Sequence, residues 1–192
     1  MKKNILLYIT IVSVISINIY SQKAKLATAD KKYDGYAYID AIKTYERVAE
    51  KGYKSADMFK KLGNSYYFNA QFNKAATWYG ELFTMDTANL EPEYYYRYAQ
   101  SLRAIDQNDK ANEMMELFNQ KSGSDSRAKL FKKNTNYLEA IKANSGRYNI
   151  EDAGINSIYS DYGTALYSNK LIFASARDTG SLGQSKHTWT NQ

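Results

Sequence analysis

The sequence predicts a mainly α-helical protein, built as a solenoid of antiparallel helical hairpins and followed by a β-rich segment. Three observations lead to this prediction. Aromatic, small and apolar residues recur with a period of about 34 residues over residues 22–125, as in stacked hairpin repeats. The chain has one proline among 192 residues, which favours helices without breaks. After residue 145 the helical spacing ends, and short runs rich in β-branched and aromatic residues replace it.

The composition narrows the classes of function. With 26 Lys and Arg against 20 Asp and Glu, the formal net charge is +6, which is too mild to favour nucleic acid as a partner. The chain has no cysteine and one histidine. Disulfides, thiolate metal sites, a cysteine nucleophile, a lipid-modified cysteine and a multi-histidine metal site are therefore excluded. We expect no cofactor and no metal.

Residues 1–21 are expected to form a secretory signal peptide. Lys2 and Lys3 supply a positive start, an apolar run extends to Ile19, and Ser21 is a small residue at a plausible cleavage point. The run is shorter than the roughly 20 apolar residues of a membrane-spanning helix, although an uncleaved anchor is the alternative. The expected location is the periplasm, or the periplasmic side of the outer membrane, of a two-membrane bacterium.

Residues 56–89 contain the clearest copy of the repeat. Gly63 and Ala75 are small residues at positions where two antiparallel helices must approach closely, and a polar turn at 69–73 separates the helices. The other residues that share the apolar face of this hairpin are Phe59, Leu62, Tyr66 and Tyr79.

The same pattern on either side predicts three repeats, at 22–55, 56–89 and 92–125. The first copy is the weakest, because lysines replace two expected aromatic residues. In the third copy, Pro92 suits the first turn of a helix, where its missing N–H costs nothing. The spacing resembles the tetratricopeptide repeat (TPR), whose units become stable by stacking.

A further amphipathic helix is predicted at 127–143, within a capping segment at 126–145. Leu130, Phe131 and Ile141 fit helical spacing, and basic residues surround them. We expect this helix to close the end of the solenoid. A basic helix that binds membranes is the alternative.

Residues 146–192 predict a β-rich segment. Residues 161–163 are expected to form a turn, and residues 171–175 a strand. Residues 160–163 and 173–177 resemble the WD-like repeat of TolB-type propellers, and this resemblance implies that residues 146–192 are an incomplete blade, the first part of a β-propeller. Because one blade cannot close a propeller, we expect the chain to be the N-terminal fragment of a longer protein.

The order of these segments resembles the N-terminal part of OmpA-family envelope proteins of Bacteroidota, of the PorE and SprD type. Members are associated with type IX secretion and gliding, and they often accompany an outer-membrane barrel of the PorP/SprF type. In that family a C-terminal OmpA-like domain binds peptidoglycan. The resemblance implies envelope proteins as partners, and peptidoglycan only through a C-terminal domain that this sequence lacks. The absence of cysteine favours the non-lipidated branch of the family.

In a TPR, the first helix of each hairpin lines the concave groove. In repeats two and three this helix offers two trios, each spaced by four and then three residues so that it forms one stripe. Their amides can bond the backbone of an extended partner, and their cations can bind a carboxylate. The alternative is an ordinary solvated surface. The candidate protein-binding residues are Lys60, Asn64, Tyr67, Tyr96, Gln100 and Arg103.

No catalytic set is evident. His187 is isolated in a loop-like segment, and Glu151, Asp152 and Asp178 lack the spacing of a catalytic or calcium-binding pair. The sequence therefore favours a non-enzymatic envelope scaffold or adaptor, which in the full-length protein would link an outer-membrane complex to the cell wall. The alternative is the docking module of a propeller-containing hydrolase or carbohydrate-binding protein.

Overall fold

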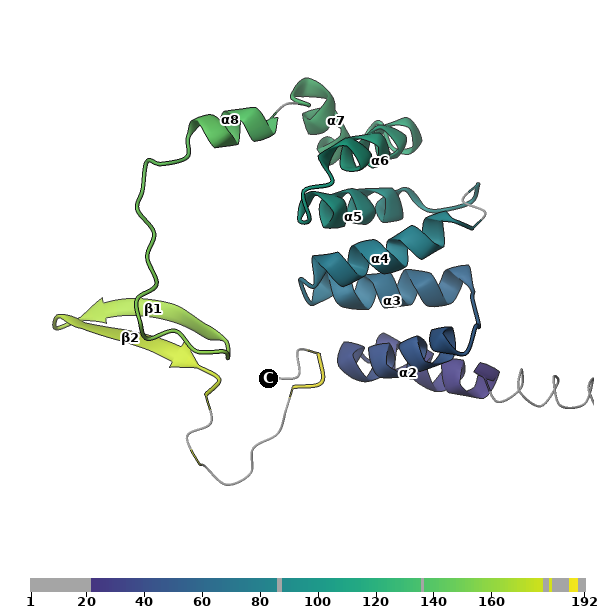
Figure 1. Ribbon diagram of the computed structural model, residues 1–192, viewed down its shortest axis with the longest axis horizontal. Coiled ribbons are helices and arrows are strands. Elements are labelled where there is room, and N and C mark those ends of the chain that lie inside the picture. The colour runs from purple at the N-terminus through teal and green to yellow at the C-terminus, as the bar shows by residue number, and fades with distance from the viewer. Residues whose placement is uncertain (1–21, 86–87, 136, 178–179, 181–186, 190–192) are drawn as a thin grey trace, which may run out of the picture.

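The computed structural model describes residues 22–85, 88–135, 137–177, 180 and 187–189 (Figure 1). The expected signal peptide and Asp178 lie outside these residues. The described chain is mainly helical, with helices packed as hairpins in one stack and a short two-stranded antiparallel sheet after them (Figure 1). Within the described residues, none of the helices has the length and apolar character needed to cross a bilayer.

Each of the three predicted repeats contains a pair of helices. Residues 22–34 are helical and precede α2. Consecutive helices from α2 to α7 pack against each other, so the hairpins form a continuous stack. The remaining helices are α2 (Tyr38–Glu50), α3 (Ala56–Phe68), α4 (Phe72–Phe83), α5 (Pro92–Arg103), α6 (Asn108–Lys121), α7 (Ser126–Lys133) and α8 (Tyr137–Ala143).

The three hairpin turns share one backbone geometry. Tyr36, Ala70 and Asp106 occupy equivalent places, with φ of 59°, 54° and 60° in the left-handed region. In each turn the next residue donates its N–H to the carbonyl five residues earlier, as Gln71 does to Tyr66 at 3.0 Å. This bond closes the C-terminus of the first helix in the manner of a Schellman motif. The turns recur in step with the predicted repeats.

The core runs through the whole helical stack. Gly63 allows the closest approach between α3 and α4, because a Cβ atom on it would lie 2.5 Å from Cε1 of Tyr79. Ala75 is fully buried in the same hairpin, so both small residues lie at the predicted helix contact. The largest fully buried side chains include Tyr45, Tyr79, Phe59, Phe118, Met58, Leu62, Leu82 and Leu102.

The prediction of one helix at 127–143 is wrong, since α7 ends at Lys133 and α8 begins at Tyr137. Asn134 leaves the helical conformation, with φ of −148° and ψ of 82°. Asparagine favours such a position because its side chain competes for backbone hydrogen bonds. Helix α7 buries Ala128 and Phe131, whereas α8 buries none of its residues. Only α7 therefore caps the stack by packing.

The sheet consists of β1 (Asp161–Tyr167) and β2 (Lys170–Ser175), which pair in antiparallel register. The strand predicted at 171–175 is confirmed. The turn predicted at 161–163 is wrong, because these residues belong to β1. Gly163, with φ of 68°, lies at a register shift in the pairing, so it allows a bulge rather than a turn.

The chain reverses instead at Ser168 and Asn169, with φ of 46° and 60°. Two successive residues with positive φ are what a type I′ hairpin turn requires. The two strands form a hairpin, and the described residues contain no propeller. Figure 1 shows this hairpin apart from the helical stack, after the extended segment that follows α8.

Candidate functional site

The two predicted trios lie on the first helices of neighbouring hairpins, α3 and α5, but their surroundings differ. Asn64 is only 4% exposed. Its Nδ2 donates to Oη of Tyr33 at 2.9 Å, and its Oδ1 accepts from Oη of Tyr79 and Nη1 of Arg97, both at 2.8 Å. Both acceptor positions of this amide oxygen are thus used within the molecule. Asn64 joins three successive hairpins, which differs from its predicted role toward a partner.

Lys60 and Tyr67 also have partners inside the stack. The Lys60 ammonium lies 2.7 Å from Oε2 of Glu91 and 5.0 Å from the centre of the Tyr94 ring. Its hydrogen bond lowers the pKa of Glu91. The Tyr67 ring lies under the guanidinium of Arg97 at 5.9 Å, and burial raises the pKa of this tyrosine. The trio of α3 therefore stabilises contacts between hairpins.

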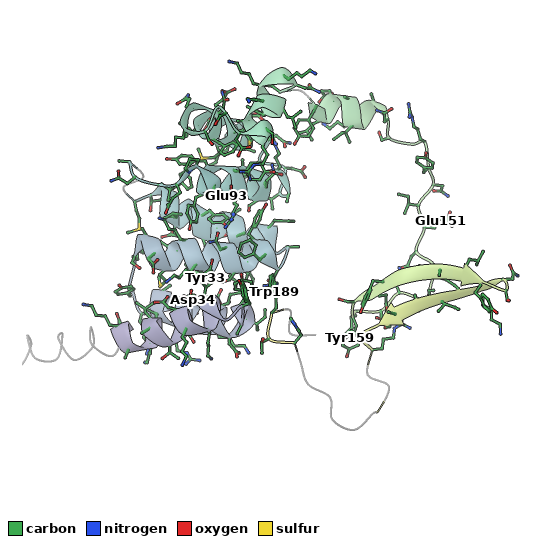
Figure 2. The ribbon with its side chains drawn as sticks, turned by 180° about the vertical axis from the view of Figure 1, so that it is seen from behind. Tyr33, Asp34, Glu93, Glu151, Tyr159 and Trp189 are labelled. Carbon is green, nitrogen blue, oxygen red and sulfur yellow. The ribbon has the colours of Figure 1, made fainter. Side chains whose placement is uncertain are left out.

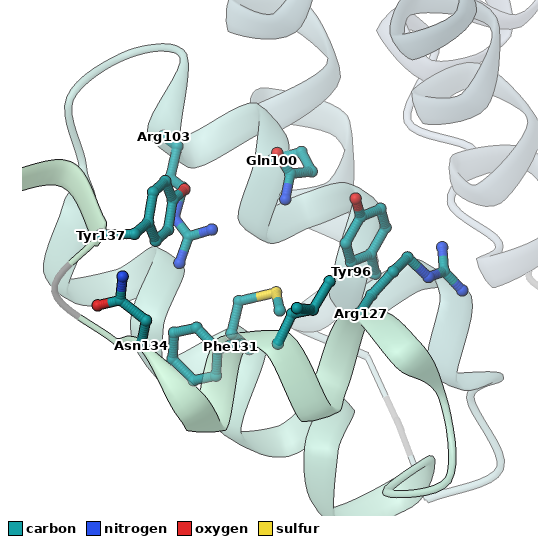
Figure 3. Close-up of a pocket in the computed structure, with 9 residues that line it drawn as sticks. Tyr96, Gln100, Arg103, Arg127, Phe131, Asn134 and Tyr137 are labelled. Carbon is teal, nitrogen blue, oxygen red and sulfur yellow. The ribbon is translucent and has the colours of Figure 1, made fainter. Parts of the chain in front are cut away.

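The trio of α5 lines a pocket of about 350 Å³ that α5 forms with α6, α7 and the start of α8 (Figure 3). Sequence reasoning placed Tyr96, Gln100 and Arg103 on one stripe, and the structure brings all three together here. The other residues that line the pocket are Met115, Arg127, Leu130, Phe131, Asn134 and Tyr137.

Arg103 is the central cation of this pocket. Its guanidinium lies 5.0 Å from the ring centre of Tyr137 and 5.6 Å from that of Phe131. Its Nη2 donates to Oδ1 of Asn112 at 3.1 Å. Its Nε is buried and has no hydrogen-bond partner among the described residues.

Arg127, the second cation of the pocket, is already neutralised. Its Nη2 lies 2.9 Å from Oε2 of Glu93 and 2.9 Å from Oδ2 of Asp125. The hydrogen bond to Asp125 is the main cause that raises the pKa of Arg127, and it lowers the pKa of Asp125 to about 2. Arg127 therefore fixes α7 against α5, and Arg103 is left as the cation available to a ligand.

Sequence reasoning missed the ion pairs that lie within the first helices of the second and third hairpins. Asp57 with Lys61, and Glu93 with Arg97, are i,i+4 ion pairs at the same positions of α3 and α5. Glu93 also binds Arg127 of α7, 34 residues later. The recurring i,i+4 spacing was a signal that could have revealed these pairs.

Two of the other chemical candidates, Asp152 and His187, make local hydrogen bonds. Oδ1 of Asp152 accepts the N–H of Gly154 at 2.8 Å, as in a turn. His187 is exposed, and its Nδ1 accepts the N–H of Trp189 at 3.3 Å. In the part of the chain that the structure describes, no three acidic, histidine or cysteine side chains gather as they would around a metal ion.

No protein-family model matches the chain, and none of the curated proteins matches its sequence.

Proposed function

We propose that this chain is a non-enzymatic scaffold of the cell envelope that binds partner proteins through the face of its first helices. In this proposal the stacked hairpins are TPRs, and the two-stranded sheet begins a propeller blade. The protein acts in the periplasm at the outer membrane. Its full-length form links an outer-membrane complex, with a barrel of the PorP/SprF type, to the cell wall. The shared geometry of the three hairpin turns supports the TPR assignment.

The observation that carries the proposal is the pocket around Arg103. A guanidinium that lines a pocket and lies within 6 Å of two aromatic ring centres is well suited to bind a carboxylate. Gln100, from the same side of α5, can hydrogen-bond the backbone of an extended segment (Figure 3). Tyr96 and Tyr137 add contact area at low cost in conformational entropy. The pocket therefore favours an acidic side chain, or a chain terminus, of a partner protein.

The lining of the pocket supports binding rather than catalysis. It contains amide, guanidinium, phenol, thioether and hydrocarbon groups, with no histidine or carboxylate among its lining residues. General acid–base catalysis near neutral pH generally uses one of those two groups.

Photo-crosslinking tests the proposal in cells of the native host. A benzophenone amino acid replaces Gln100 in the pocket, and in the matched control it replaces Thr77, an exposed residue of α4. We expect a covalent adduct with an envelope protein from position 100 and none from position 77. Arg103→Met keeps an unbranched apolar stem but removes the guanidinium and its charge, so it should reduce the adduct by about tenfold or more.

Circular dichroism first establishes that each variant keeps its helical fold. Equal adducts from positions 100 and 77 would show that this face has no specific partner. An adduct that survives Arg103→Met at full yield would show that Arg103 does not bind the partner.

A further inference from the structure

The turn between the helix at residues 22–34 and α2 contains a tyrosine, Tyr36, at a position where the geometry of the turn does not favour a bulky residue. All three hairpin turns require a left-handed residue, which is best supplied by Gly, Asn or Asp. The first turn places Tyr36 there, with φ of 59° and 62% of its surface exposed. A bulky residue in this conformation is costly and buries little within the helical stack. We therefore expect its ring to contact a residue outside the helical stack.

The Tyr36 ring stacks on the indole of Trp189. The ring centres are 5.8 Å apart and the planes differ by 9°. Trp189 also meets Tyr38 edge-on at 4.8 Å, and Tyr38 contacts Phe68 at 5.5 Å. These geometries are the favourable ones for aromatic pairs. Figure 2 shows Trp189 against the side of the helical stack, near Tyr33.

Two hydrogen bonds set the direction of the segment that carries this indole. The N–H of Ile39, in the first turn of α2, donates to the carbonyl of Thr188 at 3.4 Å. The indole Nε1 donates to the carbonyl of Phe68, the last residue of α3, at 3.5 Å. Helix ends leave such groups without partners inside the helix. The segment thus satisfies one donor and one acceptor at the ends of two different helices.

We propose that Tyr36, Tyr38 and Phe68 form a docking site for a tryptophan side chain on an extended segment. We call these three residues the aromatic cradle. Its occupant is residues 187–189 of the same chain. The indole stacks on Tyr36 and meets Tyr38 edge-on, and its N–H donates to the carbonyl of Phe68 at the end of α3. This site lies at the opposite end of the stack from the Arg103 pocket, so it stands independently of the proposed envelope function.

Trp189 fluorescence tests the cradle in the full chain. Trp78→Phe leaves Trp189 as the single tryptophan, because the chain contains two. In this background, Tyr36→Gly removes the stacking ring and relieves the left-handed backbone. Asp106→Gly is the matched control, since it relieves the same backbone geometry in the third turn without touching the cradle.

We expect acrylamide to quench Trp189 weakly in the background variant and in the Asp106→Gly control. Tyr36→Gly should lower the ratio of docked to free segment by about tenfold, with stronger quenching and red-shifted emission. Tyr38→Ala should have the same effect. Equal quenching in Tyr36→Gly and Asp106→Gly would overturn the cradle.

Dilution identifies the occupant. Quenching that stays constant over a hundredfold range of protein concentration supports docking within one chain. Quenching that increases on dilution would overturn this assignment, because the segment would then come from a second copy.

Discussion

Asn64 shows how one buried polar residue can hold a repeat stack together. Its amide bonds Tyr33, Tyr79 and Arg97, which belong to three successive hairpins. Burial raises the pKa of Tyr79 well above its ordinary value, so this hydroxyl stays protonated and donates to Asn64. A buried donor of this kind needs its acceptor, because leaving it unpaired costs about 1–3 kcal/mol. The polar groups of this interface therefore specify which hairpins are neighbours.

A pair of identical substitutions tests the packing beside this amide. Gly63→Ala places a Cβ 2.5 Å from the Tyr79 ring, whereas Gly80→Ala in α4 places one 3.4 Å from Oη of Tyr98. We expect Gly63→Ala to lower the free energy of unfolding by about 1–3 kcal/mol, because the ring must move. Gly80→Ala should be neutral, or stabilising by up to about 1 kcal/mol, through its higher helix propensity. Urea denaturation measures both.

An equal loss in the two variants would indicate a general effect of removing helical glycine. No loss in Gly63→Ala would mean that α3 and α4 do not meet at this residue.

At the scale of elements, α7 and α8 differ in how they join the stack. Helix α7 buries Ala128 and Phe131, and Asp125 caps its N-terminus by accepting the N–H of Arg127 at 2.8 Å. Helix α8 has no buried residue, and the contact of Tyr137 with Arg103 links it to α5. The Arg103 pocket therefore has one wall fixed by packing and another fixed mainly by a cation–π contact.

The pH dependence of stability tests how α7 is held. The pKa of Asp125 is about 2 in the folded chain, against an ordinary value of 3.8. Its stabilising effect should be complete above about pH 5 and should decline as the pH falls from about 4 through the folded pKa of about 2. Asp125→Asn keeps a capping residue but removes the charge. The melting temperature of the wild type should therefore exceed that of the variant at pH 6, and most of the difference should be lost by pH 2.

Arg127→Met supplies the control, because Arg127 is the main cause of the lowered pKa. In that background, Asp125→Asn should show a smaller difference that disappears at a higher pH. A difference of the same size at pH 6 and pH 2 would contradict a role for the carboxylate charge.

At the scale of the whole molecule, the helical stack and the β-hairpin are separate in their packing. Contacts between elements join neighbouring helices, or join β1 to β2, and no pair of described elements links a helix to the sheet. The strands are mostly exposed on both faces. A two-stranded hairpin of this kind is marginally stable in water by itself. Stability therefore resides in the helices, whose core extends from Ala29 to Phe131.

Truncation tests this division. A chain of residues 22–145 should melt within about 5 °C of a chain of residues 22–192, because it keeps the whole helical core. A chain of residues 22–121 is the control, and it should melt at a clearly lower temperature because it loses Ala128 and Phe131. Circular dichroism at the helical band follows both transitions. Equal melting of the two shortened chains would show that α7 does not contribute to the stack.

Much of the helical stack could be predicted from the sequence because its signals are local. Helical spacing identifies the apolar face of each helix, and the repeat period identifies the hairpins. The buried positions of Gly63 and Ala75, the helix start at Pro92 and the strand at 171–175 agree with that reasoning. Each of these predictions depends on residues a few positions apart in the sequence. Helix or strand geometry alone determines how such residues lie relative to one another.

The sequence by itself thus determined the order of three helical hairpins, and the stripe that carries Tyr96, Gln100 and Arg103. Only the tertiary structure decided what each stripe contacts. In the folded chain Asn64 points inward and bonds Tyr79, α7 closes the pocket, and Trp189 stacks on Tyr36. Periodicity specifies which side of a helix is apolar, but hydrogen bonds and aromatic pairs depend on distances between residues far apart in the chain. Those distances exist only once the helices have packed.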